Sequence, residues 1–399
     1  MRAMSEELHA SNAAVRNAAF DYLRGFGVWL VLLHHAVLAY VTFGFLNPYA
    51  YMQTFSPIAE AVMPLGATWV GFDRIALLND TFFMPLLFFV SGLFVWKSLR
   101  NKGILRFLYA RLLRLGIPFL IGLLVIIPIA FYPTVFANNL AYEVPVKGFG
   151  AFWLDYVKAG FNPPGPFWFI WLLLAFDLLA AIWYGFLKAT GLKSSRTSNP
   201  VLDNPLIFAG VLIVLSFASY LPMRIGFAPG QWGGIGPFRI EVVRVLWYLL
   251  YFGMGVAVGA RGLEKGAFRS DGPFAKYWWA WLLGGLGSYG ILTWVFSSSL
   301  SQSLGVYVFL IEAALVILAL TSVFVRFFKR RIGLFSSFSS NSYGIYLIHY
   351  LVIVWLQYAV LRVNWSASAK LLFVFFVGTA ICWAFTAAIR RIPLVRRVV

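Results

Sequence analysis

The residues best placed to do chemistry lie in one apolar stretch near the start of the chain. Residues 20–40 are mostly hydrophobic, yet they hold Asp21, Arg24, His34 and His35. Ionisable side chains inside a membrane span are costly, so their presence there indicates a functional site. An imidazole titrates near neutral pH and can act as a base, whereas a guanidinium binds anions.

Helical geometry distinguishes the two histidines. Arg24 and His35 are eleven positions apart, so on an α-helix they lie within about 20° of one stripe and about 16 Å apart along the axis. Asp21 shares that stripe, and His34 points about 80° away from it. We therefore expect His35 to face whatever Arg24 faces, and the sequence assigns no role to His34. With the N-terminus in the cytoplasm, Arg24 would lie near the inner surface and His35 in the outer half.

Each of these residues also has a structural interpretation. Arg24 could snorkel to lipid headgroups, and His35 could be a hydrogen-bond partner between helices. Asp21 could simply pair with Arg24 at the i,i+3 spacing. Because all three lie on one stripe, the pattern favours a functional site.

The composition predicts that this stretch belongs to an all-α polytopic membrane protein. Hydrophobic residues make up 61% of the chain and charged residues 12%, which lies outside the composition of soluble proteins. Long apolar runs cross lipid as helices, because a helix satisfies its own backbone groups, and the alternation typical of a β-barrel is absent. At about 20 apolar residues per span, ten helices are expected, over residues 18–42, 80–98, 115–136, 167–187, 205–222, 241–260, 277–296, 304–325, 341–361 and 371–390.

The basic residues predict the topology. A net charge of +18 would suggest nucleic acid as the partner of a soluble protein, but here the Lys and Arg fall between apolar runs. If the N-terminus is cytoplasmic, the inner segments hold 23 of the 32 Lys and Arg and the outer segments hold seven. This bias follows the positive-inside rule and predicts that both termini are cytoplasmic. No nucleic-acid partner is expected.

The sequence indicates a single membrane domain over residues 18–390. A cytoplasmic segment, 1–17, precedes it, and a basic cytoplasmic tail, 391–399, follows it. The first apolar run is too long for a signal peptide, so we expect it to be retained. Prolines interrupt residues 55–72, which predicts a re-entrant or interfacial segment. The single cysteine, Cys382, excludes an intrachain disulfide and a thiolate-rich metal cluster.

Several segments resemble the integral-membrane acyltransferase family three. The hallmark of that family is an Arg, ten residues and then a His in the first helix, matched by Arg24 and His35, with an Asp three positions before the Arg, as at Asp21. Further matches follow in the family's order and cover most of the chain. They are Ser91-Gly92, the basic loop with Arg106, Arg111 and Arg114 before Pro118, Trp168-Phe169, the glycine-rich sixth span YLLYFGMGVAVG, and NSYGIYLIHY with Tyr343, Tyr346 and His349.

The resemblance implies an O-acyltransferase in a bacterial inner membrane, closest to the glucan-modifying enzymes of the family. Such an enzyme would move an acetyl or succinyl group from acyl-CoA to a hydroxyl of an envelope carbohydrate or glycolipid. The implied catalytic residues are His35 as general base, with Arg24 and Asp21 on the same stripe. The implied phosphate-binding residues are Arg24, Arg106, Arg111 and Arg114. No metal is expected.

Five further residues are candidates for substrate contacts. They are Trp168, Phe169, Tyr346, His349 and Ser91. Trp168 and Phe169 equally fit anchors at the membrane interface, and Ser91 fits close packing of helices. His349 either supports the site or bonds across helices.

Three acidic or basic residues in or beside other spans have structural interpretations. Arg244 can pair with Glu241 at i,i+3. Asp177 is costly in a span and needs a partner that the sequence does not name.

Two other classes of function fit the same residues. A secondary transporter or flippase of an envelope glycan could use Asp21, Arg24 and His35 as a proton relay, although the chain shows no repeated halves. An inert scaffold in a glycan-assembly complex is the third class. The acyl group, the acceptor and the oligomeric state are open at this stage.

Overall fold

The protein is an all-α, multi-pass membrane protein, and its described residues include a small β-hairpin. Its computed structural model describes residues 2–42, 69–143, 145–191, 199–298 and 301–399, with the backbone alone for 2–17, 141–142, 301–303 and 397. Seven helical runs within these residues are long and apolar enough to cross a membrane. They are Val70–Lys102, Ile104–Leu140, Gly165–Thr190, Pro205–Gly226, Val242–Arg261, Leu304–Phe327 and Ala367–Ile389.

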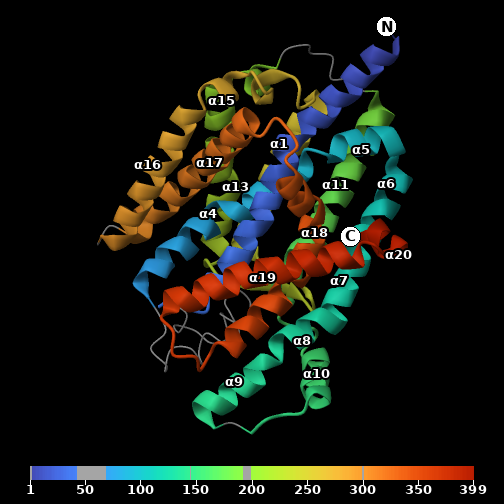
Figure 1. The fold of residues 1–399 in the computed structure, drawn as a ribbon. Helices are drawn as coiled ribbons and strands as arrows, with labels where there is room; N and C mark the ends of the chain where they lie inside the picture. The colour runs from blue at the N-terminus through green and yellow to red at the C-terminus, as the bar shows by residue number, and fades with distance from the viewer. Residues whose placement is uncertain (1, 43–68, 144, 192–198, 299–300) are drawn as a thin grey trace.

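Figure 1 shows how the elements are arranged along the chain. The first half contains α1 (Arg2–Val37), α4 (Val70–Gly92), α5 (Val95–Lys102), α6 (Ile104–Arg111), η2 (Leu112–Gly116), α7 (Ile117–Ile121), η3 (Gly122–Ile126), α8 (Ile127–Phe131), α9 (Pro133–Tyr142), α10 (Phe149–Lys158), η4 (Gly165–Phe167) and α11 (Trp168–Thr190). The second half contains α12 (Pro200–Asp203), α13 (Pro205–Gly226), β1 (Trp232–Ile235), β2 (Phe238–Glu241), η5 (Val242–Arg244), α14 (Val245–Arg261), η6 (Gly266–Phe268), α15 (Pro273–Lys276), α16 (Trp278–Ser297), α17 (Ser301–Phe327), α18 (Gly333–Ala359), α19 (Ala367–Ile389) and α20 (Pro393–Val398). Strands β1 and β2 pair antiparallel, with Trp232 opposite Glu241.

The three remaining predicted spans are also helical. Helices α1, α16 and α18 cover them, but serines, glycines and charged residues lower their mean hydropathy. The ten-span count and the cytoplasmic termini stay predictions.

Several predicted boundaries are wrong. The second helix begins at Val70 rather than at residue 80, because the polar residues at its start are satisfied within the fold, as at Asp73, which accepts from the backbone N–H of Thr42 at 2.8 Å. The predicted connection 137–166 contains the end of α9 and all of α10. The prediction for residues 55–72 falls mostly outside the described residues, and its last three residues lie in α4.

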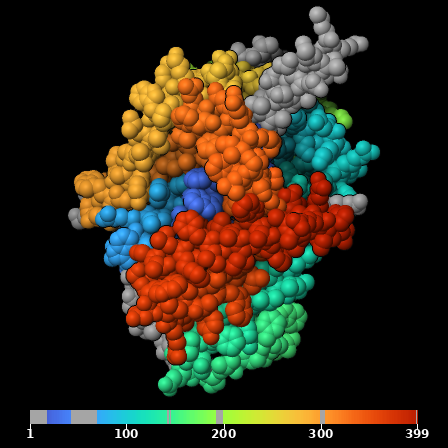
Figure 2. All heavy atoms as spheres, viewed as in Figure 1, coloured from blue at the N-terminus to red at the C-terminus, as the bar shows by residue number. Residues whose placement is uncertain are grey.

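Helix α1 forms the centre of the bundle. It runs diagonally through the molecule and packs against α4, α17, α18 and α19 (Figure 1). Leu23, Leu32 and Ala36 are fully buried along it. Figure 2 shows α19 and α20 lying as a band across one face, with a small blue patch of α1 visible beside them. His34 in this part of α1 is therefore buried among other helices.

Glycines bring α4 and α14 into close contact. A Cβ added at Gly255 would lie 2.1 Å from the carbonyl oxygen of Phe89, and one added at Gly259 would lie 1.9 Å from that of Leu93. A Cβ at Gly92 would likewise meet the Phe252 carbonyl at 2.2 Å. Small residues let helix backbones approach in a membrane. This contact fixes α14, and the short helix before it, against α4.

Prolines free three carbonyl groups that bind side chains from elsewhere in the fold. Proline lacks an N–H, so the carbonyl four residues before it loses its helical partner. Pro118 frees the carbonyl of Arg114, which accepts a hydrogen bond from the Tyr343 hydroxyl of α18. Pro128 and Pro133 free two more. These accept from the indoles of Trp153 (to Leu124, 2.9 Å) and Trp355 (to Ile129, 2.9 Å). These bonds tie the α6–α9 segment to α10 and α18.

Candidate active site

Two cavities lie beside α1, one next to Arg24 and Val28 and the other farther along the helix, next to Val31, His34 and His35. The first, here called the basic cavity, encloses about 1330 Å³ including its open mouth. Its polar lining residues are Arg24, Ser91, Ser98, Lys102, Arg111, Arg114, Ser340, Ser342, Tyr343 and Tyr346, and its apolar lining includes Val28, Phe107 and Phe169. These residues come from α1, α4, α5, α6, η2, α11 and α18. Residues from well-separated parts of the sequence, 24–28, 87–115, 169–173 and 340–346, thus form one chamber.

The basic cavity has a strong positive charge. Of the residues that the structure describes, four with cationic side chains line it and no Asp or Glu does. Arg111 forms an ion pair at 3.1 Å with Asp177, whose side chain is fully buried. This pair supplies the partner that Asp177 needs in a span. Among the described residues, no carboxylate lies within ion-pair distance of Arg114 or Lys102. The cavity is therefore suited to an anion.

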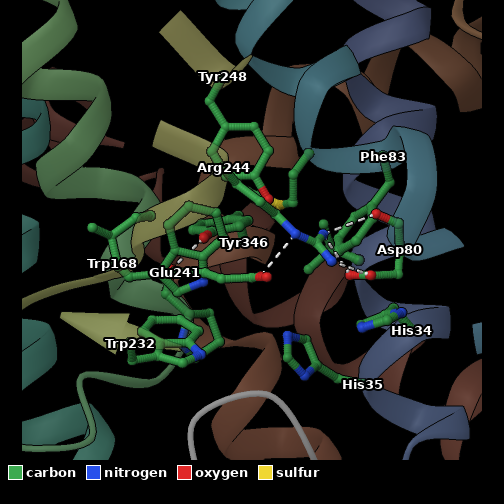
Figure 3. Close-up of a pocket in the computed structure, with 14 residues that line it drawn as sticks. His34, His35, Asp80, Phe83, Trp168, Trp232, Glu241, Arg244, Tyr248 and Tyr346 are labelled. Atoms are coloured by element: carbon green, nitrogen blue, oxygen red, sulfur yellow. Dashed lines mark hydrogen bonds and ion pairs between the residues drawn. The ribbon is translucent and has the colours of Figure 1, made fainter. Parts of the chain in front are cut away.

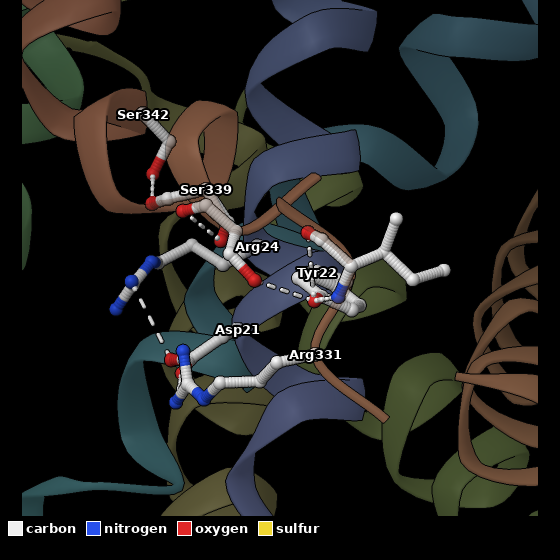
Figure 4. Close-up of polar contacts among 8 residues, drawn as sticks. Asp21, Tyr22, Arg24, Arg331, Ser339 and Ser342 are labelled. Atoms are coloured by element: carbon white, nitrogen blue, oxygen red, sulfur yellow. Dashed lines mark hydrogen bonds and ion pairs between the residues drawn. The ribbon is translucent and has the colours of Figure 1, made fainter. Parts of the chain in front are cut away.

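Arg24 reaches the basic cavity while sharing a carboxylate at its edge. Asp21 lies 3.5 Å from Arg24 and 3.2 Å from Arg331, which precedes α18 (Figure 4). The Arg24 side chain is 41% exposed, so this pairing is worth at most about 1 kcal/mol. Asp21 lines neither cavity. Its observed contacts orient Arg24 and attach α1 to the segment before α18.

The second cavity, here called the histidine pocket, lies farther along α1. It encloses about 580 Å³, including its mouth. Its lining residues are Val31, His34, His35, Asp80, Phe83, Met84, Pro166, Trp168, Trp232, Ile240, Glu241, Arg244, Tyr248 and Tyr346 (Figure 3). Both histidines contribute, so His34 faces the same pocket as His35 despite its different helical angle.

An ion cluster forms one wall of the histidine pocket. Arg244 binds both carboxylate oxygens of Asp80, at 3.0 and 2.6 Å, and its Nε lies 2.8 Å from Glu241 (Figure 3). The close contact of α4 with α14 brings Asp80 to Arg244. Two carboxylates surround one guanidinium, so the cluster carries a net negative charge when all three are ionised. The Asp80 side chain is 37% exposed, which leaves a carboxylate edge open to the pocket.

Aromatic residues form the opposite wall. The Trp168 ring stacks on Tyr248 at 5.7 Å and meets Trp232 edge-on at 6.2 Å. The hairpin that carries Trp232 is anchored by Trp171, whose indole donates to the carbonyl of Arg239 at 3.3 Å. Indole faces and carboxylate oxygens together provide both apolar and hydrogen-bonding contacts, a combination that suits a polyhydroxylated ring.

His35 lies between the pocket and the buried face of α18. Its ring centroid is 5.1 Å from that of His349, 5.0 Å from that of Tyr350 and 5.6 Å from that of His34. The His34 ring packs 4.8 Å from Phe83. The Nδ1 atoms of His34 and His35 are buried and have no hydrogen-bond partner among the described residues. Each therefore has a nitrogen available for a proton or an acceptor.

Tyr346 connects the two cavities. It lines both of them, and its hydroxyl donates to the carbonyl of Pro166 at 2.5 Å. Its ring lies 5.5 Å from that of Phe169, which lines the basic cavity, while the adjacent Trp168 lines the histidine pocket. The wall between the cavities is therefore a thin layer of aromatic side chains.

The structure brings most of the predicted site residues to these cavities. Arg24, Arg111, Arg114, Ser91 and Phe169 line the basic cavity, His35 and Trp168 line the histidine pocket, and Tyr346 lines both. His349 lies behind His35. Arg106 is exposed on α6 and lines neither cavity. The residues His35 and Arg24 thus share a stripe but face different chambers.

Sequence reasoning missed several lining residues. Lys102, Asp80 and Trp232 were not among the candidates, although Lys102 lies in the basic segment between two predicted spans. The structure confirms the expected pair of Arg244 and Glu241. It adds Asp80 as a second partner from another helix. Arg244 within an apolar run was the signal that could have indicated a second polar site.

The comparisons with known proteins identify a family. A family model described as an acyltransferase domain matches residues 17–387. The match includes both cavities except Val399. No curated protein and no solved structure matches the chain.

Proposed function

The chain belongs to acyltransferase family 3, and from that premise we propose that it transfers an acyl group between substrates held in its two cavities. The donor is an acyl-CoA in the basic cavity, and the acceptor is a hydroxyl of an envelope carbohydrate in the histidine pocket. The observation that carries this proposal is that two chambers of opposite character meet at Tyr346. The setting that we propose is a bacterial inner membrane.

The basic cavity fits the anionic part of the donor. Its four cations would contact phosphates, and Arg114 and Lys102 are the two without a carboxylate neighbour among the described residues. Arg side chains bind phosphates through paired N–H groups. From Arg24 to His35 the axial distance is about 16 Å, so the flexible arm of the donor would extend past Tyr346 to place its thioester beside His35.

The transfer step needs one base and no external reactant. As the acceptor oxygen attacks the thioester carbon, the imidazole of His35 takes the hydroxyl proton. The C–S bond breaks when the tetrahedral intermediate collapses, and the imidazolium gives its proton to the departing thiolate. An ester and a free thiol result, and His35 returns to its neutral form.

The histidine pocket fits an uncharged acceptor. Asp80 and Glu241 can accept hydrogen bonds from sugar hydroxyls, and Trp168 and Trp232 can pack on the apolar faces of a sugar ring. Arg244 is engaged by both carboxylates, so it is not free to bind a second anion. A neutral carbohydrate therefore suits this wall better than an acidic one.

Mass spectrometry of envelope glycans tests the proposal. Deleting the gene should remove an acyl group from a glycan, and the wild-type gene should restore it. A gene encoding His35→Ala should not restore it, provided that the variant protein is present in membranes at the wild-type level. Unchanged acylation after deletion would refute the enzyme proposal.

The same deletion distinguishes the transporter alternative. A flippase or transporter would change the amount of glycan on the far side of the membrane and leave the acyl content of each glycan unchanged. Asp21 lines neither cavity, so nothing in its position favours a relay from Asp21 to His35.

A further inference from the structure

The tautomer of His349 follows from a single hydrogen bond. Its Nδ1 lies 2.5 Å from the main-chain carbonyl oxygen of Tyr346. A carbonyl can only accept, so Nδ1 of His349 must carry the proton. In the neutral ring the other nitrogen, Nε2, is then a bare acceptor. It is buried and has no partner among the described residues.

The adjacent ring of His35 also has a nitrogen without a hydrogen-bond partner among the described residues. Its Nδ1 is also buried without a partner among the described residues, and the two ring centroids are 5.1 Å apart. If His35 carries its proton on Nδ1, this N–H is a donor that can serve the bare Nε2 of His349. After a rotation of the His35 ring, a direct bond from its Nδ1–H to Nε2 of His349 would satisfy both nitrogens. The opposite tautomer of His35 would leave two buried acceptors with no donor.

A contact between α1 and α18 fixes the positions of these two rings relative to each other. The carbonyls of His35 and Ala36 lie at the end of α1, where the helix supplies no further N–H groups. The side-chain amide of Gln357 on α18 donates to both, at 2.8 and 3.2 Å. Gln357 is two turns beyond His349 on the same helix, so this contact fixes how α18 presents His349 to His35.

We propose that His349 is a positioning residue that holds His35 in the Nδ1–H tautomer and thereby leaves Nε2 of His35 as the base in the histidine pocket. The catalytic meaning of this arrangement rests on the proposed function, whereas the tautomer itself does not. Binding one ring nitrogen of a histidine to fix the role of the other is a general means of orienting a base. The His34 ring packs on Phe83, and its Nδ1 accepts or donates no hydrogen bond among the described residues.

Solid-state NMR of the full chain tests the tautomer without any substrate. The protein contains only four histidines, so ¹⁵N-histidine labelling in phospholipid bilayers gives few signals, each assignable by single substitution. At a pH where the rings are neutral, His35 and His349 should both be protonated at Nδ1 and bare at Nε2. A His35 ring protonated at Nε2 in the wild-type protein would overturn the proposal.

Two substitutions at His349 separate hydrogen bonding from packing. His349→Gln places an amide oxygen near the position of Nε2 and should keep the Nδ1–H signal of His35. His349→Leu removes the acceptor and should convert His35 largely to the Nε2–H form. An unchanged His35 tautomer in a folded His349→Leu protein would also overturn the proposal.

Transfer kinetics add the functional consequence. With labelled acetyl-CoA and extracted envelope carbohydrate, His349→Leu should lower kcat at least tenfold with little change in KM for the donor, and His349→Gln should restore part of kcat. Equal losses in the two variants would reduce His349 to a packing role. If the wild-type protein gives the expected spectrum but transfers nothing, the proposed function fails while the tautomer assignment stands.

Discussion

The basic cavity and the histidine pocket share α1 and Tyr346 but differ in almost every other respect. Among the described residues, four cationic side chains and no Asp or Glu line the first, whereas two carboxylates, one arginine and two histidines line the second. The basic cavity is the larger, at about 1330 Å³ against about 580 Å³. From this difference we propose a division of roles, in which one chamber attracts an anion and the other holds a neutral partner beside a base.

The largest expected effect is at the base itself. His35→Ala should lower the rate of acyl transfer by about 10²- to 10⁴-fold, the usual contribution of a general base. His34→Gln is the matched control, since His34 lines the same pocket, and it should retain much more activity. Initial rates with labelled acetyl-CoA measure both. Equal losses of transfer rate in the two variants would contradict the assignment of the base to His35 alone.

The next effect should appear in donor binding. Arg114→Gln removes a cation with no described carboxylate partner and should raise KM for acyl-CoA about 10- to 100-fold, because a charge-assisted hydrogen bond contributes about 1.5–3 kcal/mol. The KM for the acceptor should stay constant. Arg106→Gln is the control, since Arg106 is exposed outside the cavity. If Arg106→Gln raised the KM for acyl-CoA more than Arg114→Gln did, the donor would bind outside the basic cavity.

A smaller effect is expected in acceptor binding. Trp232→Ala removes part of the aromatic wall and should raise KM for the carbohydrate about tenfold, which corresponds to about 1.4 kcal/mol. The KM for the donor should not change. Trp294→Ala, on the 61% exposed Trp294 of α16, is the control. An effect of Trp232→Ala on the donor instead would contradict the division between the chambers.

The smallest expected effect is on stability at low pH. It concerns the ion pair of Asp203 and Arg261, which lies outside both chambers. The backbone N–H of Asn199, assisted by Arg261, lowers the pKa of Asp203. A carboxyl whose pKa is lowered by folding stabilises the protein above its unfolded pKa of about 4, and this contribution is lost as the pH falls through its folded value. Between pH 7 and pH 3, the melting temperature should therefore fall slightly less for Asp203→Asn than for the wild type. Transfer at neutral pH should be unchanged. Asp271→Asn, at an exposed carboxylate, serves as the control, and an equal change there would refute the assignment.

Most cations of the basic cavity could be predicted from the sequence because the signal there is local. Basic residues cluster between two apolar runs, and the spacing of Arg24 and His35 can be computed from one helix. Helical spacing could not show that a thin aromatic layer separates the two chambers. It also could not reveal the position of Arg106, whose direction depends on how α5 and α6 pack.

The histidine pocket could be found only in the three-dimensional structure. Asp80, Trp232 and Arg244 lie on different elements, and their meeting depends on the glycine contact between α4 and α14. The β-hairpin that carries Trp232 has too few residues to stand out against the apolar spans. The role of His34 depends on the shape of the pocket rather than on its angle around α1.

Transfer across sealed vesicles would measure whether donor and acceptor use opposite chambers. Vesicles containing the purified protein can be captured through an affinity tag after Val399, which lines the basic cavity, so that this cavity faces outward. With labelled acetyl-CoA outside and envelope carbohydrate trapped inside, the carbohydrate should become labelled. With the two substrates exchanged, it should remain unlabelled. Equal labelling in both arrangements would contradict the division between a donor chamber and an acceptor chamber.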